Sequence, residues 1–224
     1  MRPRPSVRVA LLAAVLSLIA TTGAAVVPAA AHADTQVTMP TANIASVGVD
    51  KRRLSIRAGR RVAVVGRALP GFPGLRALLQ VRGRRGWHTL DTDRTAAGGR
   101  YVLRDRVGRP MSALARVVVR SAGDQARKRL GRLNAFRVAI ASWYGPGLYG
   151  NALGCGGTLT TSRLGVAHKT LPCGTKLTIR HGRRTVRVPV IDRGPYVAGR
   201  EYDLTAATAR RLGFYGHGAI LTTR

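Results

Sequence analysis

Three acidic side chains stand close together in a segment that is otherwise strongly basic. From residue 138 to residue 224 the carboxylates are Asp192, Glu201 and Asp203, against ten arginines and two lysines. A carboxylate in such a segment can move a proton, pair with an arginine, or accept backbone N–H hydrogen bonds at a turn or a helix start. Asp192 opens an Asp-Arg-Gly-Pro sequence, which fits both a tight turn and an acid/base role.

The first 33 residues have the composition of a secretory signal peptide. A basic start is followed by an apolar run over residues 9–27, and Ala31-His32-Ala33 precedes Asp34. The apolar run is nearly long enough to span a membrane, so an uncleaved anchor is the alternative. We expect cleavage after Ala33, secretion, and no stable membrane anchor afterwards.

The formal net charge of the chain is +29. Such a positive field attracts polyanions, and in a cytosolic protein nucleic acid would be the leading candidate partner. In an exported protein the candidate partners are instead anionic wall polymers, acidic lipid headgroups and peptidoglycan. The alternative is compositional bias, because the arginines are scattered over the expected strands and do not form one stripe. We expect no nucleic-acid partner and retain anionic wall polymers as candidate partners.

Residues 47–121 carry the pattern of a small antiparallel β-sandwich. Short runs rich in Val, Leu and Ile are separated by Gly and Pro turns at intervals of roughly ten residues. By this pattern the segment resembles the immunoglobulin-like modules of secreted bacterial proteins. We expect a flexible lead over residues 34–46, and a basic linker or short helix over residues 122–137, where strand alternation is absent.

Residues 138–224 carry a second all-β pattern with one short helix. The sequence DLTAATARRLG predicts that helix, with Asp203 or Thr205 as its N-terminal cap and Gly213 as its end. Asp203 is better explained as this helix-terminal acid than as a catalyst. One helix among several strands in so short a segment favours a small closed barrel.

Three blocks in this segment carry a specific resemblance to a known family. They are ASWYGPGLYGN, GVAHKTLPCGTKLTI and VPVIDRGPYVAGREYDLTAATARRLG, in this order. Residues 138–224 resemble the double-psi β-barrel domain of the rare lipoprotein A family and, more distantly, the barrels of expansins. Together with the N-terminal pattern, the resemblance predicts an all-β fold, an immunoglobulin-like β-sandwich followed by a six-stranded double-psi β-barrel with one short helix.

The resemblance implies a secreted, cell wall-associated protein with a groove for peptidoglycan glycan strands. The family includes lytic transglycosylases, which cut these strands without water and leave a 1,6-anhydro sugar. One group that protonates the leaving oxygen and then removes the proton of the sugar 6-hydroxyl can suffice. The family's acid falls on Asp192 and its histidine on His168, so these two are the expected catalytic residues. A family glutamate falls on Gly157, and a non-catalytic, expansin-like wall-binding or wall-loosening module is the alternative.

Further side chains are expected to contact the glycan or to stay apart from it. Glu201 is most simply explained as a solvated pair with its neighbour Arg200. The expected substrate-binding residues are Tyr144, Tyr149, Tyr196 and Arg193.

Cys155 and Cys173 lie 18 residues apart. In an exported protein an even cysteine count favours a disulfide, and two unpaired thiols are the alternative. Without Cys-x-x-Cys spacing or nearby histidine pairs, the sequence predicts no metal site and no organic cofactor. Because no cysteine precedes Cys155, we do not expect the lipid anchor for which the resembled family is named.

Overall fold

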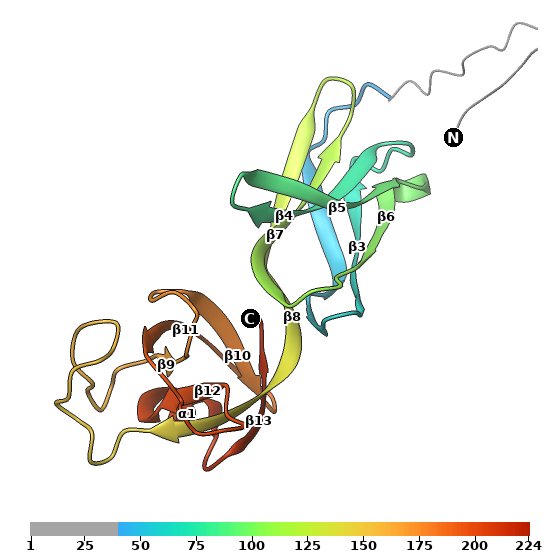
Figure 1. Cartoon of the computed structure of the whole chain (residues 1–224). Helices are drawn as coiled ribbons and strands as arrows, with labels where there is room; N and C mark the ends of the chain where they lie inside the picture. The colour runs from blue at the N-terminus through green and yellow to red at the C-terminus, as the bar shows by residue number, and fades with distance from the viewer. Residues whose placement is uncertain (1–39) are drawn as a thin grey trace, which may run out of the picture. The chain divides into compact units, whose positions relative to one another are not determined.

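The computed structural model describes residues 40–224. In this range the chain is mostly β-structure, with one α-helix, α1 (Ala206–Leu212), and one 3-10 turn, η1 (Ala97–Gly99) (Figure 1). The expected signal peptide and the start of the expected lead lie outside the described residues. Within the described range, none of the helical structure is long and apolar enough to cross a membrane.

The N-terminal part begins with a three-stranded antiparallel sheet. It contains β1 (Ser46–Arg53), β3 (Arg61–Leu69) and β6 (Arg100–Arg106), with β3 in the middle. Successive side chains of a strand point to opposite faces. Val62 and Val64 of β3 are therefore buried on one face, whereas Arg61 is exposed on the other.

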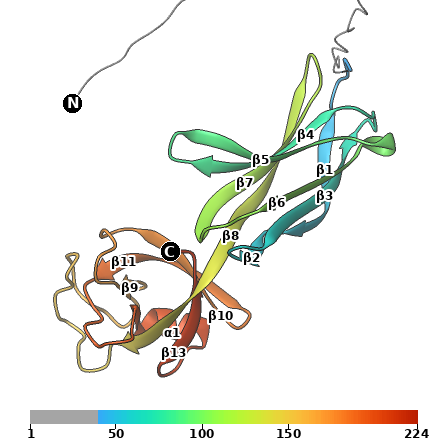
Figure 2. The same cartoon turned by 45° about the vertical axis from the view of Figure 1, so that its right-hand side comes forward.

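A second set of strands covers the buried face of the first sheet. Neighbouring strands run in the order β5 (Gly86–Arg94), β4 (Arg76–Gly83), β7 (Met111–Arg120) and β8 (Gln125–Tyr144), and β2 (Ser55–Arg57) pairs in parallel with β8 (Figure 2). Both sheets contribute to one hydrophobic cluster that contains Val64, Leu79, Tyr101, Val117 and Leu133. The immunoglobulin-like assignment of this part stays a prediction.

Two segments that we expected to be irregular are packed into this core. Ile44, in the expected flexible lead, is buried, and its N–H donates to the Asp124 carboxylate at 2.7 Å. Most of the expected linker belongs to β8 and pairs with β7. The linker prediction was wrong because a register shift opposite Gly131, whose φ is +86°, interrupts the alternating pattern of the strand.

The end of β8 is the first strand of a second, closed arrangement. The strand order β12-β9-β11-β10-β13-β8 is completed by a parallel pairing of β12 with β8, which joins the two ends into a barrel. A separate hydrophobic cluster, which includes Ala141, Leu177 and Leu204, fills it. The other strands are β9 (Val166–Ala167), β10 (Lys176–His181), β11 (Arg184–Asp192), β12 (Tyr202–Thr205) and β13 (Gly218–Thr222).

The helix α1 follows β12 directly and packs against the barrel. Thr205 is its N-cap, because the hydroxyl oxygen of this residue accepts the N–H of Thr208 at 3.2 Å. Gly213 ends the helix in the left-handed conformation, with a φ of 62°. The predicted helix and its end are thus confirmed, and Thr205 is the cap.

Candidate functional site

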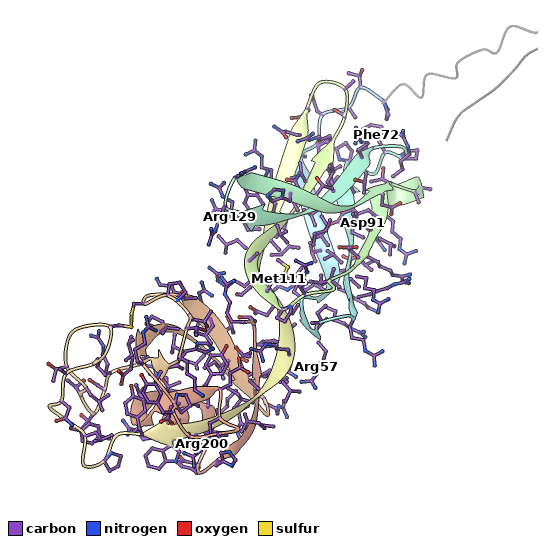
Figure 3. The ribbon with its side chains drawn as sticks, viewed as in Figure 1. Arg57, Phe72, Asp91, Met111, Arg129 and Arg200 are labelled. Carbon is purple, nitrogen blue, oxygen red and sulfur yellow. A yellow bond between two sulfur atoms is a disulfide. The ribbon has the colours of Figure 1, made fainter. Side chains whose placement is uncertain are left out.

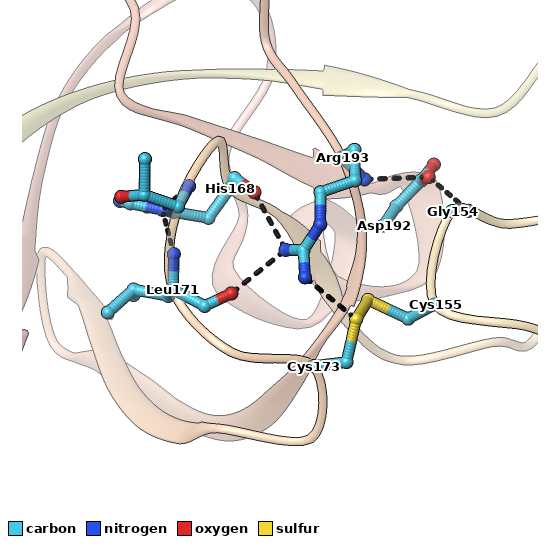
Figure 4. The surroundings of a disulfide bond; sticks show 8 residues. Gly154, Cys155, His168, Leu171, Cys173, Asp192 and Arg193 are labelled. Atoms are coloured by element: carbon cyan, nitrogen blue, oxygen red, sulfur yellow. Dashed lines mark hydrogen bonds between the residues drawn. A yellow bond between two sulfur atoms is a disulfide. The ribbon is translucent and has the colours of Figure 1, made fainter.

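Asp192 is the last residue of β11, and backbone donors hold its carboxylate. Its Oδ1 accepts the N–H of Gly154 at 2.7 Å and that of Arg193 at 2.8 Å (Figure 4). A Cβ on Gly154 would lie 3.0 Å from this oxygen and 2.9 Å from Arg193 Cγ, so the close approach favours glycine. Asp192 therefore joins the end of its strand to the Gly-rich loop that precedes Cys155.

The Arg193 side chain points away from Asp192. Its Nη1 donates to the carbonyl oxygens of Leu171 at 2.8 Å and His168 at 3.2 Å, and its Nη2 lies 2.9 Å from Cys173 Sγ (Figure 4). Arg193 was expected to contact substrate. In the structure, these contacts instead fix the backbone of residues 168–173.

The disulfide fixes the same loop from its other end. Cys155 and Cys173 are bonded, with their Cα atoms 5.6 Å apart, which confirms the predicted pairing. The bond joins the Gly-rich loop that contacts Asp192 to the loop that Arg193 holds. Two loops that are separate in sequence thus form one constrained structure beside the end of β11.

His168 follows β9 and is largely enclosed, with a side-chain exposure of 12%. Its Nδ1 accepts the N–H groups of Thr170 at 3.1 Å and Leu171 at 3.0 Å, so the proton of the neutral ring is on Nε2. Its ring packs on that of Tyr202, with centroids 4.9 Å apart. Burial, together with nearby arginines, lowers the pKa of His168, which favours the neutral ring.

Glu201 pairs with Arg137, not with its neighbour Arg200, and the predicted solvated pair was wrong. Arg137 Nη1 donates to Glu201 Oε2 at 2.8 Å, and Nη2 donates to Oε1. Burial raises the pKa of Glu201, but the hydrogen bonds and charge of Arg137 outweigh burial and hold it below its usual value. Glu201 Oε1 also lies 3.8 Å from His168 Nε2.

A hollow of about 530 Å³ lies in front of this His168–Glu201 contact. Lys169 and Arg200 also line it, and Figure 3 labels Arg200. Asp192 does not line this hollow, although its carbonyl oxygen accepts the backbone N–H of His168 at 3.2 Å. The structure therefore brings the two expected catalytic residues together through their backbones and not through their side chains.

Asp203 lies on β12, two residues before the helix cap, so the prediction that it caps the helix was wrong. Its Oδ1 accepts the hydroxyl of Ser142 at 2.9 Å, and Arg200 donates to that hydroxyl at 3.3 Å. Burial raises the pKa of Asp203 above its usual value, and the charge of Asp192 raises it further, against the opposing effects of Ser142 and Arg200. Sequence reasoning missed this role because Ser142 and Asp203 meet only through the pairing of β8 with β12.

Tyr144 lies close enough to Asp192 and Asp203 for both of their charges to affect the pKa of its hydroxyl. Its hydroxyl is buried and has no hydrogen-bond partner among the described residues. Burial, then the charges of Asp192 and Asp203, raise the pKa of Tyr144. Of the other expected substrate-binding tyrosines, Tyr149 is 37% exposed and Tyr196, in the loop after Asp192, is 79% exposed.

Comparisons with known proteins find matches to the barrel segment. Residues 137–222 match a family model described as lytic transglycolase. A probable endolytic peptidoglycan transglycosylase RlpA of Synechocystis is 38% identical over 104 residues, which are 42% of this chain and 32% of the relative. Endolytic peptidoglycan transglycosylase RlpA of Campylobacter jejuni is 43% identical over 81 residues, which are 35% of this chain and 30% of the relative.

A longer match extends the comparison. A probable endolytic peptidoglycan transglycosylase RlpA of Aquifex aeolicus is 34% identical over 121 residues, which are 53% of this chain and 51% of the relative. The chain thus spans about a third to a half of the length of these relatives. With the ring of strands described above, these matches identify residues 137–222 as an RlpA-like double-psi β-barrel.

Proposed function

We propose that this chain is a secreted peptidoglycan lytic transglycosylase whose catalytic site is formed by Asp203, which transfers the proton, and Asp192. The reaction class and the substrate come from the relatives, which are named as endolytic peptidoglycan transglycosylases. The observation that carries the proposal is the half-buried carboxyl of Asp203, whose Oδ1 accepts the Ser142 hydroxyl at 2.9 Å and whose pKa is raised by burial and by the charge of Asp192. A carboxyl whose pKa is raised by its surroundings is suited to donate a proton.

The reaction requires one proton to be given and one to be taken back. Asp203, whose pKa is raised by burial, donates its proton to the glycosidic oxygen as the bond from C1 to that oxygen breaks. The sugar 6-hydroxyl oxygen then bonds to C1, and its proton returns to Asp203, which leaves the 1,6-anhydro ring and the regenerated acid. Asp192, fixed by two backbone N–H groups, stabilises the positive charge that develops at C1.

The hollow beside His168 supplies binding groups for the same glycan. The neutral His168 ring presents its Nε2–H, and Lys169 and Arg200 add further donors for sugar hydroxyls or stem-peptide carboxylates. Tyr196 is exposed enough to place its ring against a sugar face. His168 is therefore assigned to substrate binding and to the shape of the loop, whereas the sequence alone favoured a catalytic role.

The test is digestion of purified sacculi, with and without stem peptides, followed by mass analysis of the released fragments. We expect anhydro-muramyl ends from the unchanged protein, and none above background from the Asp203→Asn variant. Asp192→Asn should retain a small fraction of the activity. The matched control is Asp50→Asn, an exposed aspartate outside the barrel, which should digest normally. Equal activity of Asp203→Asn and the unchanged protein would refute the assignment.

A second candidate function is non-catalytic, expansin-like wall binding or loosening. It is favoured by Gly157, which stands where the family has a glutamate, and by the use of Asp192 Oδ1 as a backbone acceptor. Under this alternative, the protein sediments with sacculi but releases no anhydro-muramyl products, and Asp203→Asn leaves the sedimented fraction unchanged.

The proposal also covers the fold type of the N-terminal part and the export of the protein. The two sets of strands that share one core support an immunoglobulin-like sandwich as a spacer or wall-contacting module. The signal-like composition of residues 1–33 supports export to the wall. N-terminal sequencing of the exported protein should begin at Asp34, and a start at Met1 would contradict cleavage.

A further inference from the structure

Nine basic side chains gather around two adjoining hollows that lie away from the aspartates and His168. One hollow, of about 690 Å³, is lined mainly by arginines of the N-terminal part and by Arg180 of β10. The second, of about 530 Å³, shares Arg53 and Arg61 with the first. We call this surface the basic track; its members are Lys51, Arg52, Arg53, Arg57, Arg60, Arg61, Arg104, Arg106 and Arg180.

An acidic side chain beside the basic track binds its backbone: Asp91 Oδ2 accepts the N–H of Arg104 at 2.6 Å. Neither hollow is lined by an aspartate or a glutamate. Among residues 40–224, the ion pairs involve Asp50 with Arg67 and Glu201 with Arg137 and His168, so none includes a member of the track. The pairing of β1, β3 and β6 brings together the members of the track that lie on these strands, and arginines from β2, from the turn before β3 and from β10 join them around the first hollow.

This collection is unfavourable in the free protein. Arg61 and Arg106 are direct cross-strand partners, and Arg53 and Arg104 both lie opposite Ala63, on its two sides. Like charges directly opposite each other on a sheet destabilise it. A bound anion relieves this repulsion, so the arrangement favours a ligand of negative charge.

One member of the track is held in place and still has an unused donor. The guanidinium carbon of Arg180 lies 5.3 Å from the ring centroid of Phe136, which is buried. Its Nε is buried and has no hydrogen-bond partner in the described part of the chain. Arg57, labelled in Figure 3, lines the same hollow and is exposed to solvent.

The lining also indicates which polyanion fits. Single-stranded nucleic acids are held by aromatic side chains that stack on the bases, and no aromatic residue lines either hollow. Arginine recognises phosphate and carboxylate groups by paired N–H donors. Because the hollows adjoin, a ligand with several successive anionic groups can occupy both. We propose that the basic track binds a linear, non-aromatic polyanion of the phosphodiester or polycarboxylate type.

The experiment measures binding by the full chain, and it does not depend on glycan cleavage. Labelled poly(glycerol phosphate) and labelled poly-glutamate are titrated separately and followed by fluorescence anisotropy. The test variant is Arg53→Gln with Arg61→Gln, because these two residues line both hollows. The control is Arg84→Gln with Arg85→Gln. These substitutions remove the same amount of charge, but the two arginines are exposed and line neither hollow.

We expect the Arg53/Arg61 variant to weaken binding of at least one polymer about tenfold, as the loss of charge-assisted hydrogen bonds implies, and the control to weaken it less than about twofold. The polymer that responds identifies phosphate or carboxylate as the recognised group. An Arg57→Gln/Arg60→Gln variant, in the first hollow, should also weaken binding and provides a second test if the first variant folds poorly.

Three results would overturn the proposal. An equal loss of affinity in the control would show that only net charge matters. Equal or tighter binding of single-stranded DNA of the same charge would indicate a nucleic-acid surface. Competition by glycerol phosphate monomer that equals the polymer, charge for charge, would indicate a site for one anion.

Discussion

The guanidinium group of Arg193 donates to the carbonyl oxygen of Leu171 at 2.8 Å, on the side away from the neighbouring Asp192. The two adjacent charged side chains of the Asp-Arg-Gly-Pro sequence therefore have different structural roles. The aspartate holds the Gly-rich loop through Gly154, and the arginine holds the loop that carries His168. The charge of Arg193 is directed at backbone and sulfur atoms.

Replacing Arg193 by Gln should loosen the loop of residues 168–173. The loss of charged donors to two carbonyl oxygens should lower the free energy of unfolding by about 2 kcal/mol, measured by chemical denaturation. The control is Arg183→Gln, an exposed arginine in the turn between β10 and β11, which should change stability by less than about 0.5 kcal/mol. Similar values for the two variants would contradict the role of Arg193.

Asp203→Asn should change how stability depends on pH. Because the pKa of Asp203 is raised in the folded state, its carboxyl contributes stability in acid, and this contribution is lost as the pH rises through the folded pKa. The unfolding free energy of the unchanged protein, relative to Asp203→Asn, should therefore fall between acidic and neutral pH. Denaturation at a series of pH values measures this, and a difference that rises with pH would contradict it.

Glu201→Gln should show the opposite dependence. The pKa of Glu201 is held low by Arg137, so its charge contributes stability above the ordinary glutamate pKa and loses that contribution as the pH falls through the lowered value. At neutral pH the substitution should cost about 1 kcal/mol, since the pair is about one-third exposed. The cost should disappear in strong acid. An Arg137→Gln/Glu201→Gln double variant should be less unstable than the sum of the two single variants.

Gly157→Glu tests whether the position of the family glutamate can hold a side chain here. Gly157 has a φ of +79°, and the nearest atom to an added Cβ is Arg163 Nη2 at 3.8 Å. Space is therefore available, but the backbone conformation should cost about 1 to 2 kcal/mol of stability. Gly108→Glu is the control, because that site is also open and its φ lies outside the left-handed region. Equal thermal melting temperatures for both variants would contradict this explanation.

The sequence predicted the features of the barrel that depend on local chemistry. Gly213 marks the end of α1, and the Cys155–Cys173 pair was predicted from the even cysteine count and the expected export. The role of Asp203 could not be predicted in this way. Asp203 and Thr205 were both reasonable caps by position, and the choice between them depends on Ser142, which is 61 residues away in the sequence. Glu201 and Arg137 are likewise joined only by the fold.

The expected linker failed for a different physical reason. Alternation predicts a strand when the pairing register is constant, but β8 contains an extra residue opposite β7 near Gly131. The extra residue is Leu130, which is buried, as is Leu133. The exposed basic residues before Leu130, which are Arg127, Lys128 and Arg129, give the segment the appearance of a solvated connection.

β8 supplies hydrogen bonds to the strands of both hydrophobic clusters, first to β7 and then to β13 and β12. Melting of either cluster therefore removes partners from a strand that the other cluster also requires. We expect heat or denaturant to produce one cooperative transition, in which amide protons of residues 135–139 exchange only through global opening. Because both hydrophobic clusters depend on β8, we expect the sandwich part and the barrel to unfold as a single thermodynamic unit.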